Sequence, residues 1–182
     1  LSKVEVTVFQ SLTPAPAPTV SPDELEERAR RKLSVKGVIK SWSETGLHRQ
    51  KTSAVPLVAL RVDGGVLAGT DRGEWGGELV LLRPQAAQLV LLEENIVGIH
   101  LVGSQIVVVT GLAHLGLSSG ALHRVARGSD GGLRATEWRI LPGAPTSSFV
   151  LPNGRLFVRC SGGDVLVADD GMMSLAALAL TP

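Results

Sequence analysis

The sequence predicts a mainly β protein of antiparallel, propeller-like repeats: three clear four-stranded units and an irregular N-terminal unit with one helix. Three segments, 58–70, 100–110 and 149–160, share an apolar run, a tight turn and a second apolar run. They recur at spacings of roughly 40 and then 50 residues, the range of blade-sized β repeats. The composition agrees, because 21 glycines indicate many turns and apolar residues make up 44% of the chain.

The start of the repeats sets the predicted domain boundary. Residues 55–182 form the β repeat domain, with units at about 55–94, 95–142 and 143–182. Residues 1–54 form an N-terminal part that we expect to pack on the repeats. A chain of 182 residues is long enough for one well-packed domain, and two full domains are not expected.

The first residues predict a strand and a linker. Residues 4–9 alternate apolar and polar side chains, which is the period of a half-buried strand. The Pro/Ala-rich stretch 12–18 favours extended polyproline geometry and predicts a semi-rigid spacer. The chain begins at Leu1 rather than Met, so we expect an upstream segment, and the spacer would suit a tether. These features favour an exported bacterial protein.

A helix and a short strand complete the N-terminal part. Ser21 can cap a helix that begins at Pro22 and runs to about Leu33, with acidic residues first and basic residues last. The run 38–42 predicts a short strand. A polar stretch follows it to Ser53, in which no strand is predicted.

Each repeat unit is predicted to contain four strands. In chain order the predicted strands are 56–62, 66–70, 78–82 and 88–92, then 97–102, 105–110, 121–126 and 134–141, and finally 148–151, 155–160, 164–168 and 172–178. The run 172–178 has helical propensity as well. Three units are too few for a closed propeller ring, so the N-terminal part, a second copy or a longer chain must supply contacts. A β-sandwich of the same strands is the alternative, because short strands at regular spacing do not distinguish the two.

Composition excludes several function classes. The formal net charge of +1 provides no global field to gather nucleic acid. No apolar stretch approaches the roughly 20 residues that span a bilayer, so membrane insertion is not expected. The single Cys160 cannot form an internal disulfide, and its apolar surroundings predict a buried, inert thiol. No Cys/His spacing resembles a zinc site.

The repeats resemble bacterial β-propeller-like repeat proteins over about residues 55–180. The resemblance rests on the strand–turn–strand segments and on unit endings such as 163–167 and Asp169-Asp170-Gly171. The Gly-His and Trp-Asp signatures of WD40 repeats and the paired glycines of kelch repeats are absent. The resemblance implies a binding scaffold, although some members of the family are hydrolases or lyases. No site residue carries over from it, and this scaffold does not decide function.

The connection between the second and third strands differs among the units. It is 70–77 in the first unit, 110–119 in the second and 161–163 in the third. Unequal connections at one position of a repeat commonly lie on one rim, where sequence is free to vary for binding. The residues predicted to bind a partner there are Asp71, Arg72, Glu74, Trp75 and His114.

Catalytic and metal sites are weaker alternatives at the same rim. Asp71 and Glu74 could act as an acid/base pair if His114 or His100 came near them. A metal site would need His114 and Asp71 with His123. His100 and His123 alternate with apolar residues, which favours buried, satisfied histidines. Nucleophile elbows and phosphate loops are absent, and the Asp-Gly turns have too few ligands for Ca²⁺.

These observations predict a non-enzymatic protein-interaction module. One concrete version is a small bacterial inhibitor or immunity-type protein that inserts its longest hairpin into another protein's active site. The alternatives are a hydrolase with carboxylates and histidine at the rim, and a structural part of an envelope assembly. We expect a protein partner, no cofactor or metal and no nucleic acid, and oligomerisation is compatible with the pattern.

Overall fold

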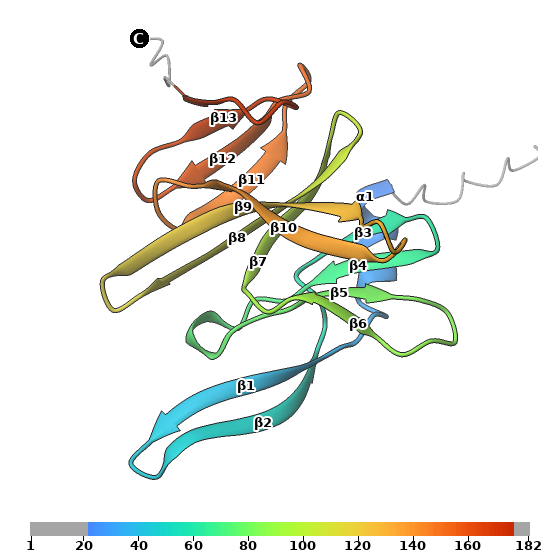
Figure 1. Cartoon of the computed structure of the whole chain (residues 1–182), viewed down its shortest axis with the longest axis vertical. Coiled ribbons are helices and arrows are strands. Elements are labelled where there is room, and N and C mark those ends of the chain that lie inside the picture. The colour runs from blue at the N-terminus through green and yellow to red at the C-terminus, as the bar shows by residue number, and fades with distance from the viewer. Residues whose placement is uncertain (1–21, 177–182) are drawn as a thin grey trace, which may run out of the picture.

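The computed structural model of the chain describes residues 22–176. These residues form one helix, a two-stranded hairpin and three four-stranded antiparallel sheets, so the protein is mainly β as predicted (Figure 1). The predicted strand at 4–9 and the linker at 12–18 lie outside the described residues. Within residues 22–176 the sheets do not close into a ring, and no helix has the length and apolar character to cross a membrane.

Each of the three four-stranded sheets is a meander of four consecutive strands, in agreement with the predicted units. The first meander contains β3 (Val58–Val62), β4 (Gly65–Gly69), β5 (Leu79–Leu82) and β6 (Leu89–Leu92). The second contains β7 (Ile96–Val102), β8 (Gln105–His114), β9 (Leu117–Arg127) and β10 (Leu133–Ile140). The third contains β11 (Pro145–Val150), β12 (Leu156–Cys160), β13 (Val165–Val167) and β14 (Met173–Leu175). The last strand confirms β structure at the start of the run 172–178.

The Asp-Gly segments form the tight turns that the sequence predicts. Gly64 closes the β3–β4 hairpin with a φ of 79°, and Gly171 precedes β14 with a φ of 86°. A left-handed backbone of this kind favours glycine because a Cβ would crowd the following carbonyl. Local turn chemistry therefore sets where the strands of each meander reverse.

The N-terminal part contains one predicted element and one unpredicted element. Helix α1 (Pro22–Arg30) lies where the sequence places it, and β1 (Val35–Ser43) covers the predicted short strand. The prediction that the polar stretch to Ser53 contains no strand is wrong, because β2 (Gly46–Ala54) pairs with β1 along its whole length. Most of β2 is exposed to solvent, so no face needs apolar side chains and the sequence lacks alternation.

Apolar clusters join the meanders in chain order. Leu67 and Leu79 of the first meander pack with Ile96 and Val108 of the second. A second cluster joins the second and third meanders; it includes Val109, Leu122, Leu156, Val158 and Cys160. The opposite face of the first meander is covered by the base of β1, where Val35 is fully buried against Ala68 and Val80. Each meander thus depends on a neighbour to bury its apolar side chains.

Candidate functional site

The connection between β4 and β5 is a structured loop. It contains the single 3₁₀ turn η1 (Gly73–Trp75), and the Asp71 carboxylate accepts a hydrogen bond of 2.8 Å from the Gly73 amide. The buried Asn95 side chain accepts from the Arg72 amide at 3.1 Å and donates to the Gly73 carbonyl at 2.7 Å. Asn95 lies outside the connection, and no sequence motif marks it. These bonds fix the loop and leave Trp75 46% exposed.

The connection between β8 and β9 is an extension of the strands. The sequence predicts a loop over 110–119, but pairing continues through Gly111–Gly120 as far as His114–Leu117. The prediction missed the extension because its small and polar residues lie largely in solvent and show no alternation. The hairpin turns at Leu115 and Gly116 and ends in apolar side chains, with Leu115 90% and Leu117 67% exposed.

The two connections meet through a contact between the His114 and Glu74 side chains. His114 Nε2 lies 2.9 Å from Glu74 Oε2, and the side chains are 35% and 41% exposed. The structure therefore brings together two of the five predicted site residues and places Trp75 beside them in η1. We name Asp71, Glu74, Trp75, His114, Leu115 and Leu117 the rim surface.

Arg72, the remaining predicted site residue, points into the protein. Its guanidinium pairs with Glu78, and the two side chains are only 9% and 8% exposed. Glu78 also accepts hydrogen bonds from the Thr70 hydroxyl at 2.8 Å and from the Val38 amide of β1 at 3.0 Å. A Cβ at Gly37 would collide with both charged groups, so glycine lets β1 approach the pair. The pair anchors the β1–β2 hairpin to the first meander.

The β8–β9 hairpin is braced from its other side by the third meander. Ser118 Oγ accepts a hydrogen bond of 2.9 Å from the Ala144 amide, and it lies 2.5 Å from Ser161 Oγ. Ser161 begins the short connection between β12 and β13. The longest connection therefore contacts each of the other two.

His100 and His123 have polar partners inside the fold, as predicted. His123 is 3% exposed and contacts Thr110 Oγ1 at 3.1 Å and Glu94 at 3.4 Å. His100 contacts Ser148 Oγ at 2.7 Å, and burial lowers its pKa from the ordinary 6.5. In the part of the chain that the structure describes, no three His, Cys, Asp or Glu side chains gather to hold a metal ion.

Cys160 is a buried free thiol, in agreement with the prediction. It is 7% exposed within the cluster that joins the second and third meanders. Burial raises the pKa of the thiol to about 11, with a smaller contribution from the Asp164 carboxylate. The thiol therefore stays protonated and unreactive at neutral pH.

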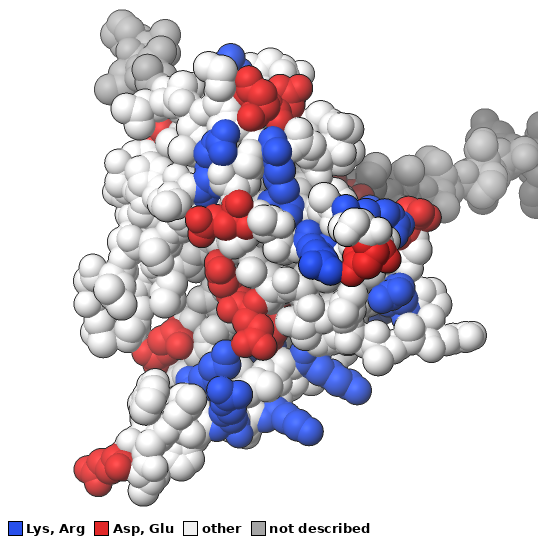
Figure 2. Space-filling view, in the orientation of Figure 1, with Lys and Arg blue, Asp and Glu red and all other residues white. Residues whose placement is uncertain are grey.

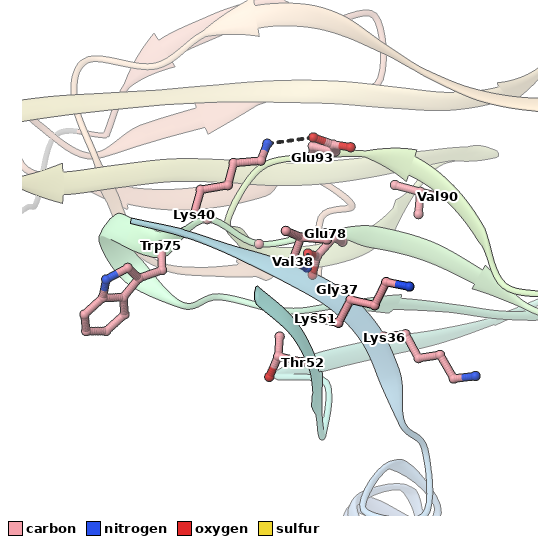
Figure 3. Close-up of a pocket in the computed structure, with 12 residues that line it drawn as sticks. Lys36, Gly37, Val38, Lys40, Lys51, Thr52, Trp75, Glu78, Val90 and Glu93 are labelled. Atoms are coloured by element: carbon pink, nitrogen blue, oxygen red, sulfur yellow. Dashed lines mark hydrogen bonds and ion pairs between the residues drawn. The ribbon is translucent and has the colours of Figure 1, made fainter. Parts of the chain in front are cut away.

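A pocket of about 360 Å³ lies between β1 and the first meander (Figure 3). Its lining combines lysines with apolar side chains and two carboxylates: Lys36, Gly37, Val38, Lys40, Lys51, Thr52, Trp75, Gly76, Gly77, Glu78, Val90 and Glu93. Trp75 thus borders both the rim surface and this pocket.

Comparison of the chain with protein-family models, curated proteins and solved structures finds no match.

Proposed function

We propose that this protein is a non-enzymatic protein-interaction module that binds a protein partner through the rim surface. The observation that carries the proposal is the exposure of Leu115, Leu117 and Trp75 on two connections that the Glu74–His114 pair joins. Tryptophan is among the residue types that dominate binding energy at protein interfaces. The polar Glu74–His114 pair would orient the partner through directional hydrogen bonds.

The backbone at Leu115 supports a role for this side chain. Leu115 has a φ of 44°, in the left-handed region that costs a residue with a Cβ about 1–2 kcal/mol. Glycine or asparagine would relieve that strain, and a polar residue would be better solvated at a tip that is 90% exposed. At 90% exposure this leucine buries little apolar surface within residues 22–176, which favours an intermolecular contact.

The three meanders serve in this proposal as blades of an open, propeller-like scaffold. Their first strands lie next to one another, because β7 packs beside both β3 and β11. In this scaffold we assign the three connections between second and third strands to one rim, because the second connection contacts the other two. A projecting, braced hairpin on an open scaffold suits a small bacterial inhibitor or immunity-type protein that occupies a cleft in its target.

A hydrolase is the second candidate, and the Glu74–His114 contact is the observation that favours it. Both side chains remain more than one third exposed, and the Asp71 carboxylate caps the Gly73 amide instead of joining them. A catalytic pair is normally shielded from water and oriented by a third group. We therefore rank this alternative, and that of an envelope component, below partner binding.

Affinity capture from the source organism tests the proposal, with wild-type protein compared with Trp75→Ala and Leu115→Ser. Leu175→Ser is the matched control, because Leu175 is a leucine 76% exposed on β14, outside the rim surface. One specific protein should be lost with both rim variants and kept with the control. Affinity for that protein should fall about thirtyfold with Trp75→Ala, the effect of truncating a hot spot.

Two results would contradict partner binding. Capture of chaperones alone by the wild type is one. The other is an equal loss of the captured protein with Leu115→Ser and Leu175→Ser, which would show that the tip of the β8–β9 hairpin has no special part in binding.

A further inference from the structure

The lysines of this protein are concentrated on one hairpin. The chain has five lysines, at positions 3, 32, 36, 40 and 51, and the last three line the pocket between β1 and the first meander. Lys36 and Lys40 are four positions apart on β1, and Lys51 pairs with Val38, which lies midway between them. Side chains at alternate positions of a strand, and those directly opposite on its partner, share one face. The three lysines therefore lie on the same face of the hairpin.

The rest of that face completes a cationic, partly apolar strip. Arg49 pairs with Lys40, and Trp42 pairs with Leu47 near the tip, so all of them share the face of Lys36. Trp42 is 80% exposed. We name Lys36, Lys40, Arg49 and Lys51, with Val38 and Trp42, the cationic face.

Charge is distributed unevenly between the hairpin and the remainder of the protein. The hairpin, residues 35–54, contains these four cations and one acid, Glu44, and so has a net charge of +3. The whole chain has +1, which leaves −2 for all other residues. Figure 2 shows Lys and Arg gathered over the β1–β2 hairpin and a band of Asp and Glu beside it.

Two of the pocket lysines are available to a ligand. The Lys40 ammonium lies 2.8 Å from the Glu93 carboxylate, and this hydrogen bond lowers the pKa of Glu93. Lys36 and Lys51, in contrast, have no ion-pair partner within residues 22–176. Figure 3 shows their ammonium groups on the same side of the pocket. Ammonium groups attract carboxylates, and the same pocket lining contains the apolar side chains of Val90 and Trp75.

Polar contacts fix the position of β1 beside the first meander. Among the described strands β1 pairs only with β2, and its other edge faces the pocket and the first meander. The Lys36 amide donates to Gln88 Oε1 at 2.9 Å, and Gln88 Nε2 donates to the Lys36 carbonyl at 2.5 Å. The Val38 amide donates to Glu78. These contacts fix the backbone of β1 beside the pocket, which lowers the entropic cost of binding.

We infer that this pocket and the cationic face bind an extended acidic segment of the protein partner. Its carboxylates contact Lys36 and Lys51, and an apolar side chain packs against Val90 and Trp75. This inference rests on the proposed function and names the chemistry of the partner. Because Trp75 belongs to both surfaces, one partner can contact the rim surface and the cationic face together.

A nucleic acid fits this surface less well than an acidic peptide. The neighbouring pocket of about 490 Å³ is lined by Glu74, Glu93, Glu94 and Glu137. A continuous phosphate backbone that followed the cationic face would meet these carboxylates and be repelled. A short peptide can place a few carboxylates on the lysines and direct apolar side chains to the rest.

Fluorescence anisotropy with labelled peptides tests the inference on the full chain. The probe is a short peptide of alternating glutamate and leucine, compared with one of alternating glutamine and leucine and with a single-stranded DNA of equal charge. The acidic peptide should bind about three- to thirtyfold more tightly than the neutral one, the range for two solvent-exposed charge pairs. Added salt should reduce the difference.

Two variants separate the position of the charges from their number. Lys36→Gln/Lys51→Gln should remove the preference for the acidic peptide, whereas Arg127→Gln/Arg155→Gln, with the same loss of charge on exposed residues elsewhere, should keep it. Gln50→Lys/Lys51→Gln keeps the net charge but moves one cation to the opposite face, because neighbouring residues of a strand point to opposite sides. This exchange should weaken acidic-peptide binding about two- to fivefold.

Three results would overturn the inference. They are equal binding of the acidic and neutral peptides, undiminished acidic-peptide binding by the exchange variant, and tighter binding of the DNA than of the acidic peptide. Failure here is distinguishable from failure of the proposed function. A captured partner that depends on Leu115 but not on Lys36 and Lys51 would refute only the acidic segment, whereas capture that ignores Leu115 would refute the rim surface.

Discussion

Two hairpins extend to the same side of this protein, and they are held in place by different physical forces (Figure 1). The β8–β9 hairpin is the continuation of a four-stranded sheet, and Val109 and Leu122 at its base are fully buried in an apolar cluster. The β1–β2 hairpin is a sheet of two strands, and apart from Val35 it is attached through polar contacts to Glu78 and Gln88. A projecting hairpin can therefore be held in place by an apolar core or by a buried charge pair, and substitutions at the two kinds of attachment should lower the free energy of unfolding by different amounts.

The largest effect is expected where the β1–β2 hairpin is anchored. Glu78→Ala would leave the Arg72 guanidinium buried without its counterion and remove the acceptor for the Val38 amide. The free energy of unfolding should fall by about 3–5 kcal/mol, as for other broken buried pairs. Urea unfolding measures it.

A double variant is the control for this anchor. Arg72→Met/Glu78→Leu replaces both charges by apolar side chains and should recover most of the stability, because no buried charge is then left unpaired. A loss below about 1 kcal/mol for Glu78→Ala would mean that the pair behaves as a surface ion pair.

The support of the β8–β9 hairpin should be revealed by two leucines of one strand. Leu122 is fully buried, so Leu122→Ala should cost about 2–5 kcal/mol by leaving a cavity. Leu117 near the tip is 67% exposed, and Leu117→Ala should change stability by no more than about 0.5 kcal/mol. Thermal or urea unfolding of both variants measures the contrast. Comparable losses at the two positions would show that the tip is also packed.

A smaller effect of opposite sign is expected at the hairpin turn. Leu115→Asn should raise the free energy of unfolding by about 0.5–1 kcal/mol, because asparagine tolerates the left-handed backbone better than leucine. The same variant should bind the captured partner more weakly. Unfolding and binding are measured on one preparation. A gain in affinity would argue against a contact by the leucine side chain.

The smallest effect is the pH dependence of the free energy of unfolding, and it should arise from His100 on β7, in the sheet that contains the β8–β9 hairpin. Burial lowers the pKa of His100, so the unfolded chain takes up a proton more readily than the folded one. This contribution to stability is complete above pH 6.5, the ordinary pKa of histidine, and is lost progressively as the pH falls below it.

Substitution of His100 isolates that contribution. His100→Gln can keep a hydrogen bond to Ser148 but does not titrate, so its stability should decline less below pH 6.5 than that of the wild type. Urea midpoints on either side of this pH measure the difference, and carboxylates common to both proteins cancel. Identical declines would mean that His100 does not contribute.

Strands could be predicted from the sequence where apolar and polar residues alternate. Strands with one buried side, such as β4 and β12, were found near their true positions because alternation and turn residues are local signals. β2 was missed because both of its faces meet solvent or polar groups. Glu78 and Asn95 were missed because a single polar residue beside an apolar run has no pattern.

Of the predicted site residues, some lie together at the surface and one is buried. The sequence located the unequal connections, and the structure brings Glu74 and His114 of two of them into contact. It turns Arg72 inward, although composition made this residue a candidate for an exposed contact. Whether a side chain on a loop faces solvent depends on contacts beyond its immediate neighbours, here with Glu78, six residues along the chain, and with β1 at Gly37.

The three four-stranded meanders and their turns could be predicted from the amino-acid sequence, since these depend on side-chain alternation and backbone freedom over a few neighbouring residues. The contact between the connections of the first two meanders, and the pocket that the lysines of β1 and β2 line beside it, became evident only in the folded protein. Those outcomes depend on how sheets pack and on where a buried charge finds its partner, and such long-range contacts have no signature in local sequence.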